Sequence, residues 1–323
     1  MMLQNVETIN QSEVSLQQFK LSSPVSIILI LLGIFQVAGS QAYAQAPALA
    51  GGPMLECSGL PCVDVTLASG KHLRMLIDTG NVNSMLDAAV AKDLGLSLEP
   101  VMGQDGKPFP GYSKAILKGA NVGNGALGDL KVLVADIGEY IKKDQMPAAQ
   151  GTLAYTAFKN RLLEMDYKKH TVSFSEPLVS DVACPVKCGE LTFPTFGKKG
   201  PPIVVATQFS VNGKEVAVQI DTLFSGTMLI YPTSVTKLGL DRESHSAEKR
   251  FFKYTDGGVD MMEGKASTEA FAGNVLAKPA PVYFATPAVH LPDGMFDGTV
   301  GHELFRHAVL TLDLHNNRVW LAN

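Results

Sequence analysis

A strand-and-loop unit that occurs twice is the feature of this 323-residue sequence that most restricts its fold. In the first half an apolar run leads into an Asp-Thr-Gly triplet at Asp78, and in the second half a similar run leads into Asp-Thr-Leu at Asp221. In each half a Gly-Lys pair precedes the aspartate, and a Met-Leu pair and a Leu-Gly-Leu triplet follow it. Such internal similarity indicates one structural unit used twice. Two copies related by a pseudo-twofold axis would place Asp78 and Asp221 face to face.

A second pair of matching segments lies later in each half. Residues 151–166 align with residues 298–313 without a gap, and both segments begin with Gly, Thr and an apolar residue. With the two Asp-Thr loops, these segments make the sequence resemble the two-lobed aspartic proteases of the pepsin and retropepsin type, including the bacterial exported aspartyl proteases. The resemblance covers roughly residues 55–322. It implies an all-β, bilobal fold of two duplicated β-barrel-like lobes with short helices.

The N-terminal segment predicts export. Residues 24–38 form an apolar run that is short for a membrane span but suits the core of a signal peptide, and a small-x-small pattern follows at residues 42–44. We therefore expect a signal peptide over residues 1–44, an N-terminal lobe over residues 45–178 and a C-terminal lobe over residues 179–323. An uncleaved N-terminal anchor is the alternative. Either arrangement predicts an exported protein, periplasmic or secreted.

The four cysteines agree with export. Cys57 and Cys62 form one close pair and Cys184 and Cys188 form another, each ahead of the aspartate of its own half. Four cysteines allow three pairings, and we expect two local disulfides, one in each lobe, formed in an oxidising compartment. A zinc site made by all four thiolates is the alternative that the spacing allows.

Composition limits the classes of partner. Hydrophobic residues make up 46% and charged residues 18% of the chain, which suits a folded core, and the formal net charge is only −4. Because there is no basic run, the sequence argues against nucleic acid as a partner. We expect a monomer that acts on a peptide or protein substrate, with no membrane contact beyond the possible N-terminal anchor.

Local patterns place both aspartates at the ends of strands. Asn212-Gly213, between two alternating apolar runs, predicts a tight hairpin before Asp221. Residues 87–94 and 232–238 each predict a short helix that ends at a glycine. Residues 104–107 predict another hairpin tip. In the protease family a flap hairpin carries a tyrosine near its tip, and Tyr112 is the nearest candidate, a surface loop tyrosine being the alternative.

Two other motifs are set aside. Gly123, Gly125 and Gly128 fit a dinucleotide-binding pattern, but the following residues predict a strand and not the helix that would hold a pyrophosphate. His302 and His307 are five residues apart, which rotates them by about 140° around a helix, unlike the four-residue spacing of a zinc protease. We interpret them as surface or helix-end histidines. We expect neither a metal nor a cofactor.

The resemblance assigns peptide hydrolysis to Asp78 and Asp221. Two carboxylates about 3 Å apart do not both ionise readily, so one keeps a proton while the other activates a shared water. By the same resemblance, Thr79 and Thr222 lock the two loops together beneath the pair, and Gly80 allows the close approach of the first loop.

Ser84 and Thr227 follow the two aspartates at matching positions, and we expect their hydroxyls to hydrogen-bond the outer carboxylate oxygens. Leu223 departs from the family, which has glycine there, as at Gly80 in the first half. If the loop needs a positive φ, leucine is strained. If it does not, the leucine side chain packs into the floor of the binding cleft or narrows it.

Two hypotheses of function follow. The first is an exported aspartic endopeptidase. The second is a protein of the same fold that binds peptides or a partner with little or no cleavage. A third interpretation takes both aspartates as ordinary loop residues, and the repeat in register disfavours it.

Overall fold

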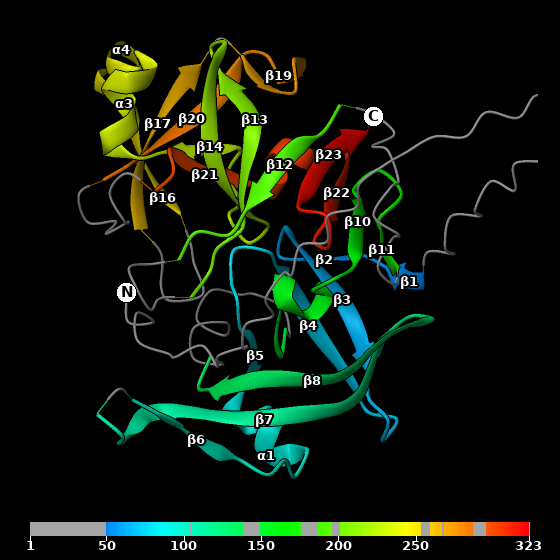
Figure 1. Cartoon of the computed structure of the whole chain (residues 1–323). Helices are drawn as coiled ribbons and strands as arrows, with labels where there is room; N and C mark the ends of the chain where they lie inside the picture. The colour runs from blue at the N-terminus through cyan, green and yellow to red at the C-terminus, as the bar shows by residue number, and fades with distance from the viewer. Residues whose placement is uncertain are drawn as a thin grey trace, which may run out of the picture.

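Strands dominate the computed structural model, which describes residues 50–103, 105–137, 149–175, 187–195, 201–252, 259–266, 268–286 and 295–322. Figure 1 shows two strand-rich lobes, with the first half of the chain in the lower one and most of the second half in the upper one. In this described part, the strands form two sheets that only short helices accompany. The predicted all-β, bilobal fold is confirmed.

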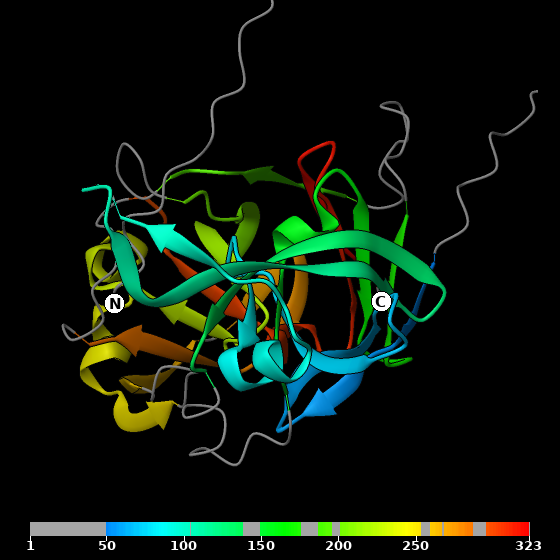
Figure 2. The same ribbon diagram turned by 90° about the horizontal axis from the view of Figure 1, so that it is seen from below.

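The N-terminal lobe is built on an eight-stranded sheet in the order β2-β3-β4-β9-β5-β8-β7-β6. Its strands are β2 (Leu55–Cys57), β3 (Leu60–Thr66), β4 (His72–Asp78), β5 (Ser84–Asp87), β6 (Glu99–Met102), β7 (Pro108–Val122), β8 (Gly125–Ala135) and β9 (Gly151–Ala154). Alternation directs one face of β3 and β4 inward, where Val63 pairs with Met75 and Val65 with Leu73 in the buried core. The long β7–β8 hairpin crosses this lobe in Figure 2.

The C-terminal lobe belongs to the larger sheet. Its strands are β12 (Gly189–Thr192), β13 (Val205–Val211), β14 (Lys214–Asp221), β15 (Met228–Ile230), β16 (Glu248–Phe252), β17 (Val259–Ala266), β18 (Glu269–Phe271), β19 (Asn274–Ala277), β20 (Ala280–Ala285) and β21 (Gly298–Gly301). Helices α3 (Pro232–Leu238) and α4 (Asp241–His245) lie at its outer end in Figure 1.

The predicted turns and helix ends are present. Asn212 and Gly213 have φ values of 49° and 77°, which close the β13–β14 hairpin before Asp221. Helix α1 (Ala88–Asp93) begins at Asp87, whose Oδ1 accepts from the backbone N–H groups of Ala89 and Val90. Helix α3 ends at Gly239, whose left-handed φ of 66° suits a residue without a side chain.

The repeat is visible in how the strands pair. β4 lies parallel to β9, with Asp78 opposite Ala154, and β14 lies parallel to β21, with Asp221 opposite Gly301. The strand that follows each aspartate turns back and pairs antiparallel with the same partner, β5 with β9 and β15 with β21. Each aspartate therefore ends a central strand of a duplicated motif, as the sequence predicts.

A shared sheet joins the lobes. β10 (Leu162–Asp166) and β11 (Thr171–Ser175) form a hairpin, β22 (Val309–Asp313) and β23 (Arg318–Ala322) form its repeat, and β1 (Ala50–Pro53) lies at the edge. β10 and β22 pair antiparallel around Glu164 opposite Thr311, which is the arrangement expected where a pseudo-twofold axis crosses a sheet. The lobes are thus held by backbone hydrogen bonds as well as by side chains.

The Cys57–Cys62 disulfide is confirmed, and it ties β2 to β3. Cys188 is also disulfide-bonded. Cys184, the signal-peptide region 1–44, the lobe boundary at 178–179 and Gln104 of the predicted hairpin tip lie outside the described residues. A disulfide indicates an oxidising, exported environment.

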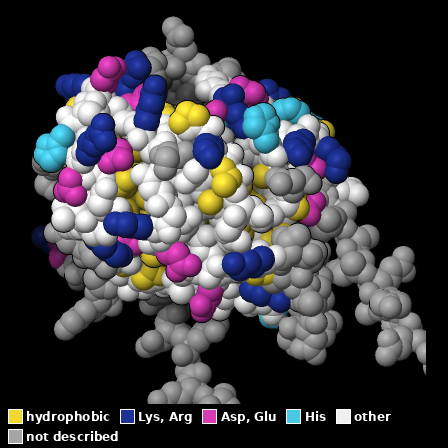
Figure 3. Space-filling model, turned by 90° about the horizontal axis from the view of Figure 1, so that it is seen from above, with side chains coloured by type: hydrophobic (Ala, Val, Ile, Leu, Met, Phe, Trp, Pro, Cys, Tyr) yellow, Lys and Arg dark blue, Asp and Glu magenta, His cyan; other side chains and the backbone are white. Residues whose placement is uncertain are grey.

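In the part of the chain that the structure describes, no helix has the length and apolar character to cross a membrane. On the face seen in Figure 3, basic and acidic side chains are interspersed, and apolar side chains occur among them in small groups.

Glu269 is a carboxylic acid in the core of the C-terminal lobe. It is 0% exposed, its Oε1 lies 3.4 Å from Thr227 Oγ1, and its Oε2 has no hydrogen-bond partner among the described residues. Burial raises the pKa of Glu269 to about 8. The side chain is therefore protonated in the folded protein at neutral pH, where an unfolded chain would have it ionised.

We expect the buried acid to make the protein less stable as the pH rises. The pKa of Glu269 is about 8 in the folded protein and 4.5 ordinarily, so between these values the folded state binds a proton that the unfolded state has lost. The free energy of unfolding is therefore highest at low pH and falls as the pH rises through this range. Glu269→Gln should flatten the fall in melting temperature over that range, measured by circular dichroism. The exposed control Glu215→Gln should retain the wild-type slope. Equal slopes for both variants would contradict the buried neutral acid.

Candidate active site

The two Asp-Thr loops are joined by a reciprocal set of hydrogen bonds. The backbone N–H of Thr79 donates to Thr222 Oγ1 at 3.1 Å, and the backbone N–H of Thr222 donates to Thr79 Oγ1 at 3.1 Å. Each hydroxyl then donates across the lobes to a carbonyl, Thr79 to Ile220 at 2.9 Å and Thr222 to Ile77 at 2.5 Å. Both threonines are 0% exposed, so each buried polar atom here has its partner in the opposite lobe.

Gly80 marks how closely the loops approach. A Cβ atom added at Gly80 would lie 2.5 Å from Cγ of Asp221 and 2.8 Å from both of its carboxylate oxygens. The Gly80 carbonyl also accepts a bond of 2.8 Å from Nε2 of Gln219 in the other lobe. The carboxylate of Asp221 therefore packs against the loop that carries Asp78, and glycine is required for space.

The two aspartates share a desolvated environment. Asp78 is 7% exposed, and Asp221 is partly buried. Burial and the neighbouring charge of Asp221 raise the pKa of Asp78 well above its ordinary value, and backbone and side-chain donors at Gly80 and Asn81 oppose this in part. Burial also raises the pKa of Asp221, against the N–H groups of Leu223 and Phe224. Such a pair holds a proton at a pH where separate aspartates would both be ionised.

Asn81 is a functional candidate that the sequence analysis missed. Its Oδ1 accepts a bond of 3.3 Å from the backbone N–H of Asn83, which leaves the amide N–H groups to donate to Asp78. The matching position in the second half is Phe224, which is buried and has no polar side-chain atom. The signal was present in the sequence as a polar residue three positions after Asp78.

The predicted roles of Ser84 and Thr227 need correction. Ser84 Oγ accepts a bond of 3.0 Å from the backbone N–H of Ala154, and Thr227 Oγ1 donates to the carbonyl of Pro281 at 2.6 Å. Both hydroxyls lie where neighbouring strands of the repeat meet, and each has a backbone partner there. Thr227 Oγ1 also lies 3.4 Å from Oε1 of Glu269. The two hydroxyls support the strands beneath the loops instead of the outer carboxylate oxygens.

Leu223 is accommodated without backbone strain. It is not among the residues with positive φ, and its N–H donates to Oδ1 of Asp221 at 2.9 Å. Its side chain packs, partly buried, against an apolar cluster of the N-terminal lobe that also receives Tyr112. The buried members of this cluster are Cys57, Leu60, Cys62, Leu76, Ala135, Ile137 and Ala149. The interpretation that the Leu223 side chain packs is therefore confirmed, and the interpretation that its backbone is strained is wrong.

Tyr112 lies within β7, beyond the hairpin turn between β6 and β7. Its ring centroid is 5.4 Å from that of Phe109. Its role as a flap residue stays a prediction.

The histidines of the C-terminal lobe differ from each other. His302 begins the short 3-10 helix η2 (His302–Phe305) but is only 4% exposed, so the surface interpretation is wrong for it and the helix-end interpretation holds. His307 is exposed. Within the described ranges, no group of three or more His, Cys, Asp or Glu side chains is placed to hold a metal ion.

Comparison with protein families identifies the class of the first lobe. Residues 63–154 match the aspartyl protease family model. This segment runs from β3 through β9 and contains Asp78, Thr79 and Gly80, so the resemblance to aspartic proteases is confirmed on the lobe that carries the complete triplet. No curated protein matches the chain.

Solved structures with a similar chain course include seed globulins. Conglutin gamma, a basic 7S globulin from lupine seeds, is 10% identical, with a TM-score of 0.49 over 86% of this chain and 95% of that one. Basic 7S globulin from soybean is 9% identical, with a TM-score of 0.45 over 85% and 95%. The structure of edgp is 11% identical, with a TM-score of 0.47 over 86% and 95%.

The threonine lock should contribute measurably to stability. Thr222→Val keeps the shape of the side chain but leaves the Thr79 N–H and the Ile77 carbonyl buried without partners, so we expect a loss of about 2 kcal/mol in the free energy of unfolding in urea. Thr171→Val, at an exposed position of β11, is the matched control and should change stability little. Equal stability of the two variants would show that the reciprocal bonds contribute nothing.

Proposed function

We propose that this protein is an exported aspartic endopeptidase that hydrolyses peptide bonds with a water activated by Asp78 and Asp221. The observation that carries the proposal is the reciprocal Thr79–Thr222 bonding, which fixes two desolvated aspartates on opposed loops. The aspartyl protease match over residues 63–154 and the Cys57–Cys62 disulfide support the reaction class and the export. A peptide or protein is the substrate class, and the acting unit is a monomer.

The chemistry follows from one proton shared by two carboxylates. The ionised aspartate takes a proton from the bound water as the water oxygen attacks the scissile carbonyl carbon. The protonated aspartate donates to the carbonyl oxygen and stabilises the charge that develops there. When the tetrahedral intermediate collapses, the C–N bond breaks and the aspartate that took the water proton gives it to the leaving nitrogen. The other aspartate recovers its proton from a hydroxyl of the intermediate, and the products are a carboxylic acid and an amine.

The two loops support the aspartates unequally. Asp78 has the side-chain amide of Asn81 as a donor, which favours its ionised form. Among the described residues, the donors to the Asp221 carboxylate are the backbone N–H groups of Leu223 and Phe224. In the proposed mechanism Asn81 orients and tunes Asp78, and Leu223 presents an apolar surface beside Asp221.

A second candidate is a peptide-binding protein of the same fold with little or no cleavage. The observation that favours it is the replacement of small or polar positions by Leu223 and Phe224 in the second loop. Both candidate functions require the same pair of loops, and a measurement of peptide cleavage distinguishes them.

Replacing either aspartate should abolish cleavage. Asp78→Asn and Asp221→Asn each remove the shared acid-base pair, so we expect at least a thousandfold loss, on the order of the loss seen when other catalytic groups are removed, measured by mass spectrometry on a peptide library. Circular dichroism should show intact folding. Asp93→Asn, an exposed helix position, should retain full activity. Activity that survives both changes would exclude the mechanism, and a folded wild type that cleaves nothing between acidic and neutral pH would favour the binding protein.

Replacing Asn81 should move the pH profile. Asn81→Ala removes a donor that opposes the rise in the pKa of Asp78, so the pair should keep its proton to higher pH. We expect the alkaline limb of kcat/KM to shift upward in pH. Asn83→Ala leaves the backbone N–H that contacts Asn81 in place and should leave the profile unchanged. A lower rate with an unshifted profile would show that Asn81 has only a structural role.

A further inference from the structure

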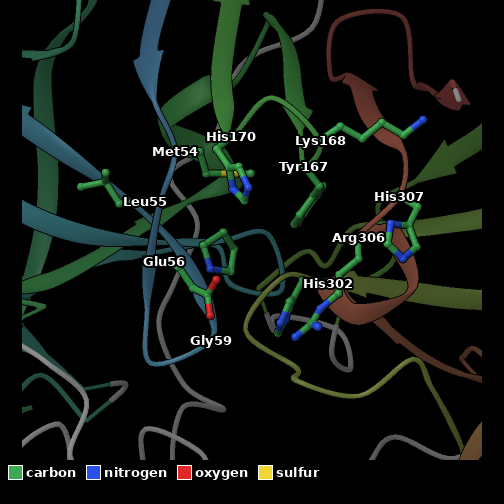
Figure 4. Close-up of a pocket in the computed structure, with 11 residues that line it drawn as sticks. Met54, Leu55, Glu56, Gly59, Tyr167, Lys168, His170, His302, Arg306 and His307 are labelled. Atoms are coloured by element: carbon green, nitrogen blue, oxygen red, sulfur yellow. The ribbon is translucent and has the colours of Figure 1, made fainter.

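A pocket lies between the lobes, and none of its described lining residues belongs to the aspartate loops. It has a volume of about 430 Å³ and is formed by the disulfide hairpin β2–β3, the turn between β10 and β11, and the η2 region. Figure 4 shows Tyr167 between His170 on one side and Arg306 and His307 on the other, with Glu56 and Gly59 from the disulfide hairpin below them. The pocket therefore joins segments that are far apart in the sequence.

The charge of this pocket is predominantly basic. Of the described lining residues, the basic ones are Lys168, His170, His302, Arg306 and His307, and the one acidic residue is Glu56. Burial lowers the pKa of His302, so its imidazole favours the neutral form and the positive charge comes from the other residues. Arg306 contacts Glu303, outside the lining, through its Nε at 2.6 Å. This ion pair is largely exposed and therefore weak, and the guanidinium has further N–H groups that suit a carboxylate or a phosphate.

The basic residues are not part of the duplicated design. His302 aligns with Tyr155, and His307 with Asn160, in the N-terminal copy. Arg306 aligns with Lys159, so only one of these three positions is basic in both copies. The fold itself does not require this collection of imidazole and guanidinium groups in the second lobe.

The inner wall of the pocket contacts the loop that carries Asp221. Nδ1 of the buried His302 lies 3.1 Å from the carbonyl oxygen of Phe224 and donates to it, and the His302 backbone N–H donates to the same oxygen at 3.2 Å. Phe224 is three residues after Asp221. A ligand in this pocket would thus lie one side chain away from the Asp221 loop.

We propose that this pocket binds a small multivalent anion, bearing carboxylate or phosphate groups, through Arg306, His307 and His170. Met54, Pro61 and Tyr167 add an apolar wall that suits a compact organic anion. Lys168 extends away from the other side chains in Figure 4, so it contributes charge at the rim and not a direct contact. The site does not depend on peptidase activity.

Isothermal titration calorimetry tests the site directly. Inorganic phosphate and citrate are titrated separately into the full protein at about pH 6. We expect at least one of them to bind with a Kd of about 1 mM or tighter. Binding of citrate alone identifies an organic carboxylate site, and binding of phosphate alone identifies a phosphate site. No heat from either anion at concentrations about tenfold higher would overturn the proposal.

Substitutions in the pocket lining test whether the anion binds there. The double variant Arg306→Gln with His307→Gln should lower the affinity for the anion at least about tenfold. Arg306→Lys should retain part of the affinity because it keeps the positive charge. Lys71→Gln with Arg242→Gln removes two exposed cations elsewhere and should leave binding unchanged. Asp78→Asn should also bind like the wild type, which separates this site from the proposed catalysis. Equal binding by the pocket and control variants would overturn the assignment.

Discussion

The hydrogen bonds between Thr79 and Thr222 are the interaction on which the arrangement of this protein depends. Each threonine supplies a backbone donor and a hydroxyl, and each finds its acceptor in the opposite lobe. Both residues are fully buried, so water does not replace a missing partner. The bonds are consequently satisfied only when the two copies face each other about a pseudo-twofold axis. The pairing of β10 with β22 around Glu164 and Thr311 imposes the same axis at another place.

On this symmetric frame the two loops have different chemistry. In the first loop, small Gly80 admits the carboxylate of Asp221, and Asn81 donates to Asp78. In the second, Leu223 reaches into the cluster around the Cys57–Cys62 disulfide, and Phe224 is buried against Tyr283, with ring centroids 6.0 Å apart. One aspartate is therefore supported by a polar side chain, while the other is set beside apolar surface. The backbone symmetry is retained because both loops keep negative φ values at these positions.

Buried acids give the protein a common dependence on pH. Burial raises the pKa of Asp78, Asp221 and Glu269 above their ordinary values. For each of them the neutral form is the one that a desolvated site favours, so their contribution to stability is greatest at acidic pH and declines as the pH rises. Asp313 has the opposite pH dependence. It is buried beside Arg318 and Asn316, whose donors hold its pKa below the ordinary value, so its contribution to stability is lost as the pH falls.

The sequence by itself determined the repeat, the strand ends at Asp78 and Asp221, the β13–β14 turn and the helix ends, because these depend on residues close together in the chain. The resemblance of the two Asp-Thr loops to those of aspartic proteases also pointed to Thr79 and Thr222 as the pair between the lobes. Only the tertiary structure decided that Ser84 and Thr227 bond to strand backbone, that Leu223 packs without strain, and that Asn81 serves Asp78. Those outcomes depend on which atoms of distant segments come within hydrogen-bonding or packing distance, and spacing along the chain does not contain that information.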